Sequence, residues 1–333
     1  MIRSILFDIL APILVLVLLG AVTRRKFALD IPTLTKLNIY LFVPAFIFDV
    51  VSRGRLSWSE MGGVMLLTAV NVLTLGLVVW GIGRALRVSR KTLSAIALAV
   101  MFYNSGNYGL PLAALAFPAE AASAGSAGGV RDGAAVQAFV VFAMNILTFT
   151  VGLAIAASAG AGHWSKALTT LVRLPMLPTV AAALVARWWI QSAPGRELPI
   201  AISKSAEYLA AGLIPLALVT LGAQLADNPR WPRWRPVGMA VFLRLVYAPG
   251  QMAALLYGFH LIGWGPLDLW GRDGWPAASL VLTAGVPTAV NTLLMVLEVG
   301  GEADLAADCV FWTTVASCVT MTGWLVVIRV WMG

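Results

Sequence analysis

Two neutral amides, Asn104 and Asn107, lie in the middle of a long apolar stretch of the chain. Gly106, Gly109 and Pro111 accompany them, and a continuous helix disfavours both residue types, because glycine lowers helix stability and proline lacks an N–H group. An interrupted helix leaves backbone N–H groups free where its second half begins, and that end carries partial positive charge. Amide side chains beside such an end could bind an anion without a fixed cation.

A second interruption follows in the other half of the chain, where Pro287, Thr288 and Asn291 break an apolar run. Paired breaks in corresponding halves of a membrane protein indicate a transporter's binding site. We expect the first break to cover residues 104–111, with the second half-helix starting near Pro111. The alternative for any single asparagine is that it only satisfies the backbone opened by the break.

Four further residues are candidates for shaping or lining a cavity. Asn145 is a lone amide in an apolar helix, where it either lines the site or hydrogen-bonds to a neighbouring helix. Pro44 and Pro215 occupy matching places in the two halves and are expected to kink their helices. Pro44, Pro215, Gly109 and Thr288 are all expected to shape the cavity.

Ionisable residues inside apolar runs are functional candidates by default. Arg244 lies about eight residues into its run and is expected to extend its side chain to the cytoplasmic surface. Asp49 and Glu207 are close to the ends of their runs, and their roles stay open. No buried Lys or Arg is therefore expected near either break. The sparse histidines and cysteines indicate no metal site, no cofactor and no enzymatic activity.

The chain that must position these residues is 60% hydrophobic and only 11% charged, against about 25% charged residues in soluble domains. It is predicted to be an all-α polytopic membrane protein. Its net charge is +8, but the basic residues lie between the apolar runs, which does not suggest a nucleic-acid-binding surface. We predict ten transmembrane helices, the first of them a helix rather than a signal peptide. Their ranges are about 5–22, 34–51, 61–86, 93–117, 133–158, 168–190, 200–225, 236–259, 277–299 and 305–331.

The two halves, residues 1–158 and 168–331, are interpreted as five-helix repeats, because their prolines and breaks recur in similar register. An odd number of helices per repeat requires the second copy to enter the membrane from the opposite face, so the repeats are inverted and the fourth and ninth helices cross at the midplane. Lys and Arg are moderately more frequent on one side, which favours both termini outside. The Ala/Gly/Ser-rich segment 119–132 is expected to be a flexible loop.

Four segments together resemble the auxin efflux carrier family, which includes bacterial permeases and plant auxin exporters. They are residues 104–111 (Asn-Ser-Gly-Asn-Tyr-Gly-Leu-Pro), 213–225, 244–249 and 284–291. The resemblance implies crossed broken helices, a scaffold and a transport domain that move as an elevator, and a homodimer. It implies transport of organic anions, carboxylates such as malate or malonate in bacteria and auxin in plants. It also assigns substrate binding to Asn107, Pro111, Asn145, Pro287 and Asn291. The short segment 158–169 indicates a bacterial-type member in the inner membrane.

The sequence thus predicts a secondary-active or facilitative carrier of a small organic anion. A sodium-coupled carrier of the bile-acid type is the alternative nearest in fold, and sodium-dependent uptake would distinguish it. A channel is less favoured and would show no saturable counterflow. The exact carboxylate, the direction of transport and any proton or sodium coupling stay open.

Overall fold

The computed structural model describes residues 7, 9, 11–27, 29–54, 56–118, 133–159, 175–226, 232–265, 267–270, 275–298 and 301–331. Regular structure in these residues is helical, and each of the ten predicted apolar runs contains helix. The first half holds α2 (Ala11–Lys26), α3 (Ile31–Leu37), α4 (Val43–Arg53), α5 (Trp58–Ala85), α6 (Arg90–Met101), α7 (Leu110–Ala116), α8 (Gly133–Leu147) and α9 (Leu153–Ala159). The second half holds α11 (Met176–Gln191), α12 (Ile200–Leu225), α13 (Trp234–Phe242), α14 (Ala248–Ile262), α15 (Trp275–Ala284), α16 (Val290–Glu298) and α17 (Ala303–Trp331).

Six continuous helical segments of the described residues are long and apolar enough to cross a membrane. They are Ile31–Arg53, Trp58–Ala85, Gly133–Ser158, Ile200–Leu225, Trp234–Ile262 and Ala303–Trp331. The prediction of an all-helical, multi-pass membrane protein is therefore confirmed. The predicted loop 119–132 and most of the segment 158–169 lie outside the described residues.

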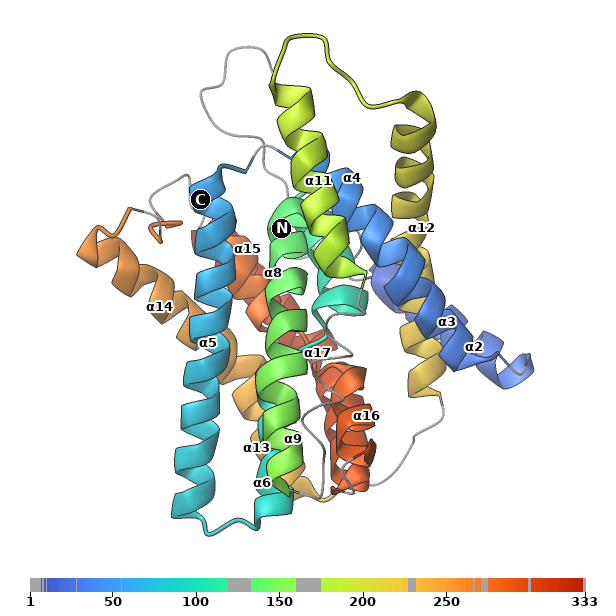
Figure 1. Ribbon diagram of the computed structural model, residues 1–333. Helices are drawn as coiled ribbons and strands as arrows, with labels where there is room; N and C mark the ends of the chain where they lie inside the picture. The colour runs from blue at the N-terminus through green and yellow to red at the C-terminus, as the bar shows by residue number, and fades with distance from the viewer. Residues whose placement is uncertain are drawn as a thin grey trace.

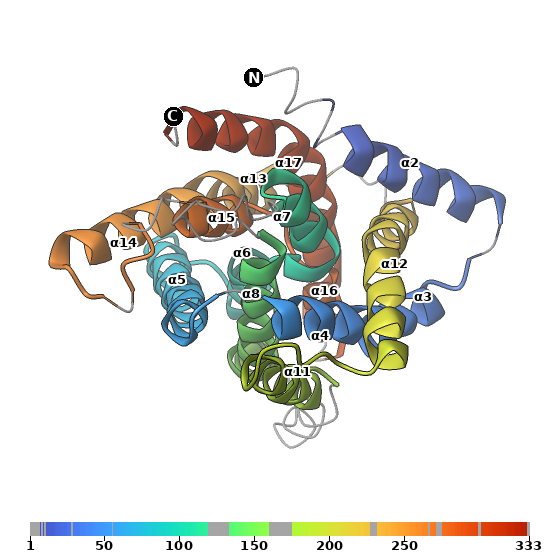
Figure 2. The same ribbon diagram turned by 90° about the horizontal axis from the view of Figure 1, so that it is seen from above.

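The helices pack in two groups, which stand side by side in Figures 1 and 2. In the first, α2 runs along α12, and both α11 and α12 pack on α4; we call α2, α3, α4, α11 and α12 the flanking group. In the second, α5 packs on α6 and α8, while α17 contacts α6, α13, α15 and α16. We call these helices, together with α7, α9 and α14 that pack on them, the crossover group. It contains both interrupted helices, including the residues of each break.

Glycines bring α2 and α12 into backbone contact within the flanking group. A Cβ added at Gly20 would overlap the Val219 carbonyl, and one added at Gly222 would overlap the Val17 carbonyl. Small residues at both positions allow the close approach from which membrane helices gain packing energy in the absence of water.

Widened π-helical turns precede three prolines that lie within long apolar helical segments. They are η2 (Asn38–Phe42) before Pro44, η3 (Ser105–Gly109) before Pro111 and η5 (Leu243–Tyr247) before Pro249. Proline cannot donate to the carbonyl four residues earlier and its ring clashes with that carbonyl, so a wider turn accommodates it. Pro215 differs from these three, since it lies inside the continuous helix α12.

A polar cluster ties three helix ends together on the side of the molecule where α5 ends. The Glu302 carboxylate accepts a hydrogen bond from the Thr92 hydroxyl at the start of α6, and pairs with Arg233 before α13 at 2.6 Å. Partial burial would raise the pKa of Glu302, but the hydrogen bonds from Thr92 and Arg233 outweigh this and lower the pKa below its ordinary value of 4.5.

Candidate anion-binding site

The two helix breaks cross each other and pair through their backbones. Tyr103 and Thr288 form an antiparallel bridge. The Asn104 N–H donates to the Pro287 carbonyl at 2.8 Å, and the Ala289 N–H donates to the Phe102 carbonyl at 3.0 Å. Backbone groups that each break would leave unsatisfied in the membrane interior are thus satisfied by the other break.

The first break is shorter than predicted and lies earlier in the chain. α6 ends at Met101, and helical structure resumes at Ser105 in η3, so only residues 102–104 separate the two halves. α7 begins at Leu110 with Pro111 in its first turn, as expected, but the π-helical turn η3 extends helical structure back to Ser105. The free N–H groups of the helix start belong to residues near Ser105 instead.

Asn104 caps this helix start. Its Oδ1 accepts a hydrogen bond from the Asn107 N–H at 3.1 Å, as an asparagine at this position commonly does. Gln137 on α8 supports the turn by donating from Nε2 to the Ser105 carbonyl at 2.7 Å. Gly109 leaves room for this contact, since a Cβ there would lie 2.5 Å from Gln137 Nε2.

The partner break is held from two sides. The Thr288 N–H donates to Thr313 Oγ1 of α17 at 3.1 Å, and Thr288 Oγ1 donates to the Ala99 carbonyl of α6 at 2.7 Å. Thr288 is fully buried. α16 then begins at Val290, so its first N–H groups lie beside Asn291.

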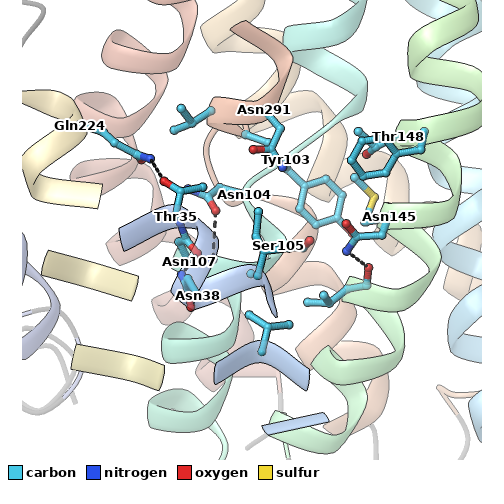
Figure 3. Close-up of a pocket in the computed structure, with 18 residues that line it drawn as sticks. Thr35, Asn38, Tyr103, Asn104, Ser105, Asn107, Asn145, Thr148, Gln224 and Asn291 are labelled. Atoms are coloured by element: carbon cyan, nitrogen blue, oxygen red, sulfur yellow. Dashed lines mark hydrogen bonds between the residues drawn. The ribbon is translucent and has the colours of Figure 1, made fainter. Parts of the chain in front are cut away.

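A cavity of about 90 Å³ lies at the crossing, between the flanking group and the crossover group (Figure 3). Its volume suits a molecule of several non-hydrogen atoms. The flanking group contributes Thr35, Asn38 and, from α12, Gln224. The polar residues that line it from the crossover group are Tyr103, Asn104, Ser105, Asn107, Asn145, Thr148 and Asn291.

The two groups meet through the amides of this cavity. Asn38 Nδ2 of the flanking group donates to Asn107 Oδ1 of the crossover group at 2.7 Å. Within the flanking group, the Gln224 amide lies 3.5 Å from Thr35 Oγ1. Within the described part of the chain, four buried polar atoms of the lining have no hydrogen-bond partner. They are Asn38 Oδ1, the Tyr103 hydroxyl, Asn104 Nδ2 and Gln224 Oε1. Unpartnered buried polar groups are costly, so these atoms could serve as hydrogen-bond partners for water or for a polar ligand.

The sequence-predicted residues divide into two sets. Asn104, Asn107, Asn145 and Asn291 all line the cavity. The lining residues do not include Pro44, Gly109, Pro111, Pro215, Pro287 or Thr288. Asn145 bonds within its own helix, since its Nδ2 donates to the Val141 carbonyl at 2.7 Å. Sequence reasoning missed Thr35, Asn38, Tyr103, Thr148 and Gln224, although the spacing of Thr35 and Asn38 puts both on one helix face.

The position of Arg244 contradicts two expectations from the sequence. Its side chain is fully buried rather than extended to the surface, so a buried cation does lie beside both breaks. Its guanidinium donates to the Val100 carbonyl at 2.6 Å and also to the Ala284 carbonyl. The helix face that carries Arg244 packs against the two helix breaks. There the Val100 and Ala284 carbonyls accept the hydrogen bonds that the guanidinium would otherwise donate to water.

Two crossed helix breaks around a small polar cavity are typical of a membrane transporter. Comparison with known proteins agrees: the chain belongs to the family described as "Membrane transport protein", whose family model matches residues 5–325. This match confirms the resemblance to the auxin efflux carrier family.

Two relatives extend over nearly the whole chain. A protein of Rhizobium meliloti (strain 1021) named "Putative malonate transporter" is 27% identical over 330 residues, covering 96% of this chain and 94% of its own. An "Uncharacterized transporter" of Methanothermobacter thermautotrophicus is 26% identical over 327 residues, covering 95% and 96%. The chain is therefore similar to transporters rather than to enzymes.

Proposed function

We propose that the protein is a secondary-active or facilitative carrier of small carboxylates, with malonate the first candidate. The observation that carries the proposal is the cavity at the crossing, which combines unpartnered amide and hydroxyl groups with the N-terminal ends of two half-helices. Such ends attract anions through free N–H groups and partial positive charge. The relative named for malonate supports the choice of a small dicarboxylate.

The two helix groups suggest how the site moves. Thr35, Asn38 and Gln224 of the flanking group face the asparagines of the crossover group across the cavity. If the crossover group slides along the flanking group, the substrate travels with the breaks and meets water on alternate sides. This elevator mechanism assigns the role of scaffold to the flanking group, and its glycine contacts between α2 and α12 keep that group rigid.

The remaining parts of the proposal follow from the sequence and the family. They are two inverted five-helix repeats, 1–158 and 168–331, both termini outside, a bacterial inner membrane location and a homodimer. Orientation can be tested after Cys309 and Cys318 are replaced by serine. A single cysteine at Ser192 should then react with an impermeant maleimide on intact cells, and one at Ser89 should not; the reverse pattern would overturn the orientation.

The function itself is tested by a binding screen of short mono- and dicarboxylates with the purified protein in detergent. We expect at least one, malonate among them, to bind saturably and more tightly than its uncharged amide. Asn107→Ala and Asn291→Ala should weaken binding by about ten- to a hundredfold, because a hydrogen bond to a charged group contributes roughly 1.5–3 kcal/mol.

Gln191→Ala is the matched control, since it removes an exposed amide at the end of α11, far from the cavity lining. Equal affinity for carboxylates and their neutral amides would contradict the proposal. So would undiminished binding in both asparagine variants.

A further inference from the structure

Arg244 joins the C-terminal ends of the two helices that precede the breaks. In a continuous helix the Val100 carbonyl would accept from the N–H of residue 104, and the Ala284 carbonyl from that of residue 288. Here the Asn104 N–H donates to Pro287 instead, and the Thr288 N–H donates to Thr313. Arg244 donates to these two released carbonyls.

The guanidinium thus lies at the negative ends of two helices at once. A helix C-terminus carries about half a negative charge, so α6 and α15 together present roughly one negative charge to Arg244. Within the described residues no ion pair joins Arg244 to a carboxylate. The two helix ends are therefore what balances its charge.

One aromatic ring separates this cation from the cavity. The Arg244 guanidinium carbon lies 4.7 Å from the centroid of the Tyr103 ring, and Tyr103 lines the cavity. Without Arg244, an anion in the cavity would be attracted by two helix N-termini but repelled by the two nearby C-termini. With Arg244 those C-termini are neutralised, and the attraction of the N-termini remains.

Arg244 is also held in place from behind. Pro249 cannot donate to the Leu245 carbonyl four residues earlier, and the indole Nε1 of Trp324 donates to that carbonyl instead at 2.9 Å. This bond fixes the π-helical turn η5, which carries Arg244, against α17.

We propose that Arg244 is the residue that makes the site selective for anions, by cancelling the negative helix ends at the crossover. This inference rests on the proposed transport of carboxylates. Arg244 contacts no cavity surface itself and acts through the charge it places behind Tyr103. The size of the effect follows from Coulomb's law: a unit charge about 10 Å from the ligand, in an effective dielectric of about 20, changes the binding constant roughly tenfold for each ligand charge, and so roughly a hundredfold for the malonate dianion.

The test measures the ratio of affinities for malonate and malonamide, its uncharged diamide, in the full-length purified protein. Arg244→Gln removes the charge and keeps an amide donor for the carbonyls; Arg244→Lys keeps the charge. We expect Arg244→Gln to lower the ratio roughly a hundredfold through weaker binding of the malonate dianion, with malonamide affinity unchanged. Arg244→Lys should preserve the ratio even if it melts at a lower temperature.

Arg187→Gln is the matched control. Arg187 is also a buried arginine that donates to a carbonyl, that of Leu56 at 2.5 Å, but it lies on α11 in the flanking group. Its substitution should leave the ratio unchanged. A wild-type ratio in Arg244→Gln, or a ratio lost equally in Arg244→Lys, would overturn the inference while leaving carboxylate transport intact. A wild-type protein that does not prefer malonate would overturn both proposals.

Discussion

We propose that Asn104 has two separable roles, and replacing it by serine or alanine distinguishes them. Its Oδ1 caps the helix start at Asn107. Its Nδ2 has no partner in the described part of the chain, and Asn104 lines the cavity. Serine is as good an N-cap residue as asparagine, whereas alanine costs about 0.5–2 kcal/mol at such a position. Neither replacement carries the amide donor.

We therefore expect both variants to bind malonate about ten- to a hundredfold more weakly, the loss that corresponds to roughly 1.5–3 kcal/mol for a hydrogen bond to a charged group. Only Asn104→Ala should also lose about 1 kcal/mol of stability. Isothermal titration measures the first quantity and denaturant unfolding the second.

Asn71→Ala is the control for burial, because Asn71 is a buried amide of α5 that bonds Gln251 on α14 rather than lining the cavity. It should lower stability without weakening binding. If Asn104→Ser binds malonate as well as the wild type does while Asn104→Ala does not, Asn104 only caps the broken helix. The reasoning that places it in the site would then be refuted.

Three further predictions concern packing and pH. Gly222→Leu should separate α2 from α12, because the leucine side chain would overlap the Val17 carbonyl. The variant should melt at a lower temperature than the wild type. Gly81→Leu is the control and should melt as the wild type does, since Gly81 has open space around it. Trp324→Phe should cost about 1–3 kcal/mol, because the Leu245 carbonyl loses its donor, and full stability of the variant in unfolding experiments would contradict that role. The lowered pKa of Glu302 means that its contribution to stability is complete above pH 4.5 and is lost as the pH falls through the folded-state pKa. Glu302→Gln should remove that acid-dependent step from the pH profile of the melting temperature, and an unchanged profile would show that Glu302 does not cause it.

The existence of both breaks could be predicted from the sequence, because glycines, prolines and amides together destabilise a continuous helix that faces lipid. The same signal led to Asn104, Asn107 and Asn291, whereas Asn145 was singled out as a lone amide in an apolar helix. The start of α7 beside Pro111 could be predicted, but the π-helical turn η3 that extends the helix back to Ser105 could not. Local sequence does not show whether a turn widens in this way.

The contribution of the flanking group was missed for a different reason. Asn38 and Gln224 reach the cavity only because distant helices pack side by side, and single residues in apolar runs do not reveal that packing. The burial of Arg244 was missed because its hydrogen-bond partners are backbone carbonyls. No acidic residue in the sequence signals them, and they become free only through the breaks themselves.

Counterflow in proteoliposomes tests the central claim, carriage of a small carboxylate at the crossing, most directly. Vesicles loaded with unlabelled malonate should accumulate labelled malonate transiently and saturably. Excess external malonate should abolish the uptake, malonamide should not, and Asn107→Ala should reduce it while Gln191→Ala leaves it unchanged. Uptake that rises linearly with concentration, or that Asn107→Ala does not alter, would contradict a carrier with its binding site at the crossed helices.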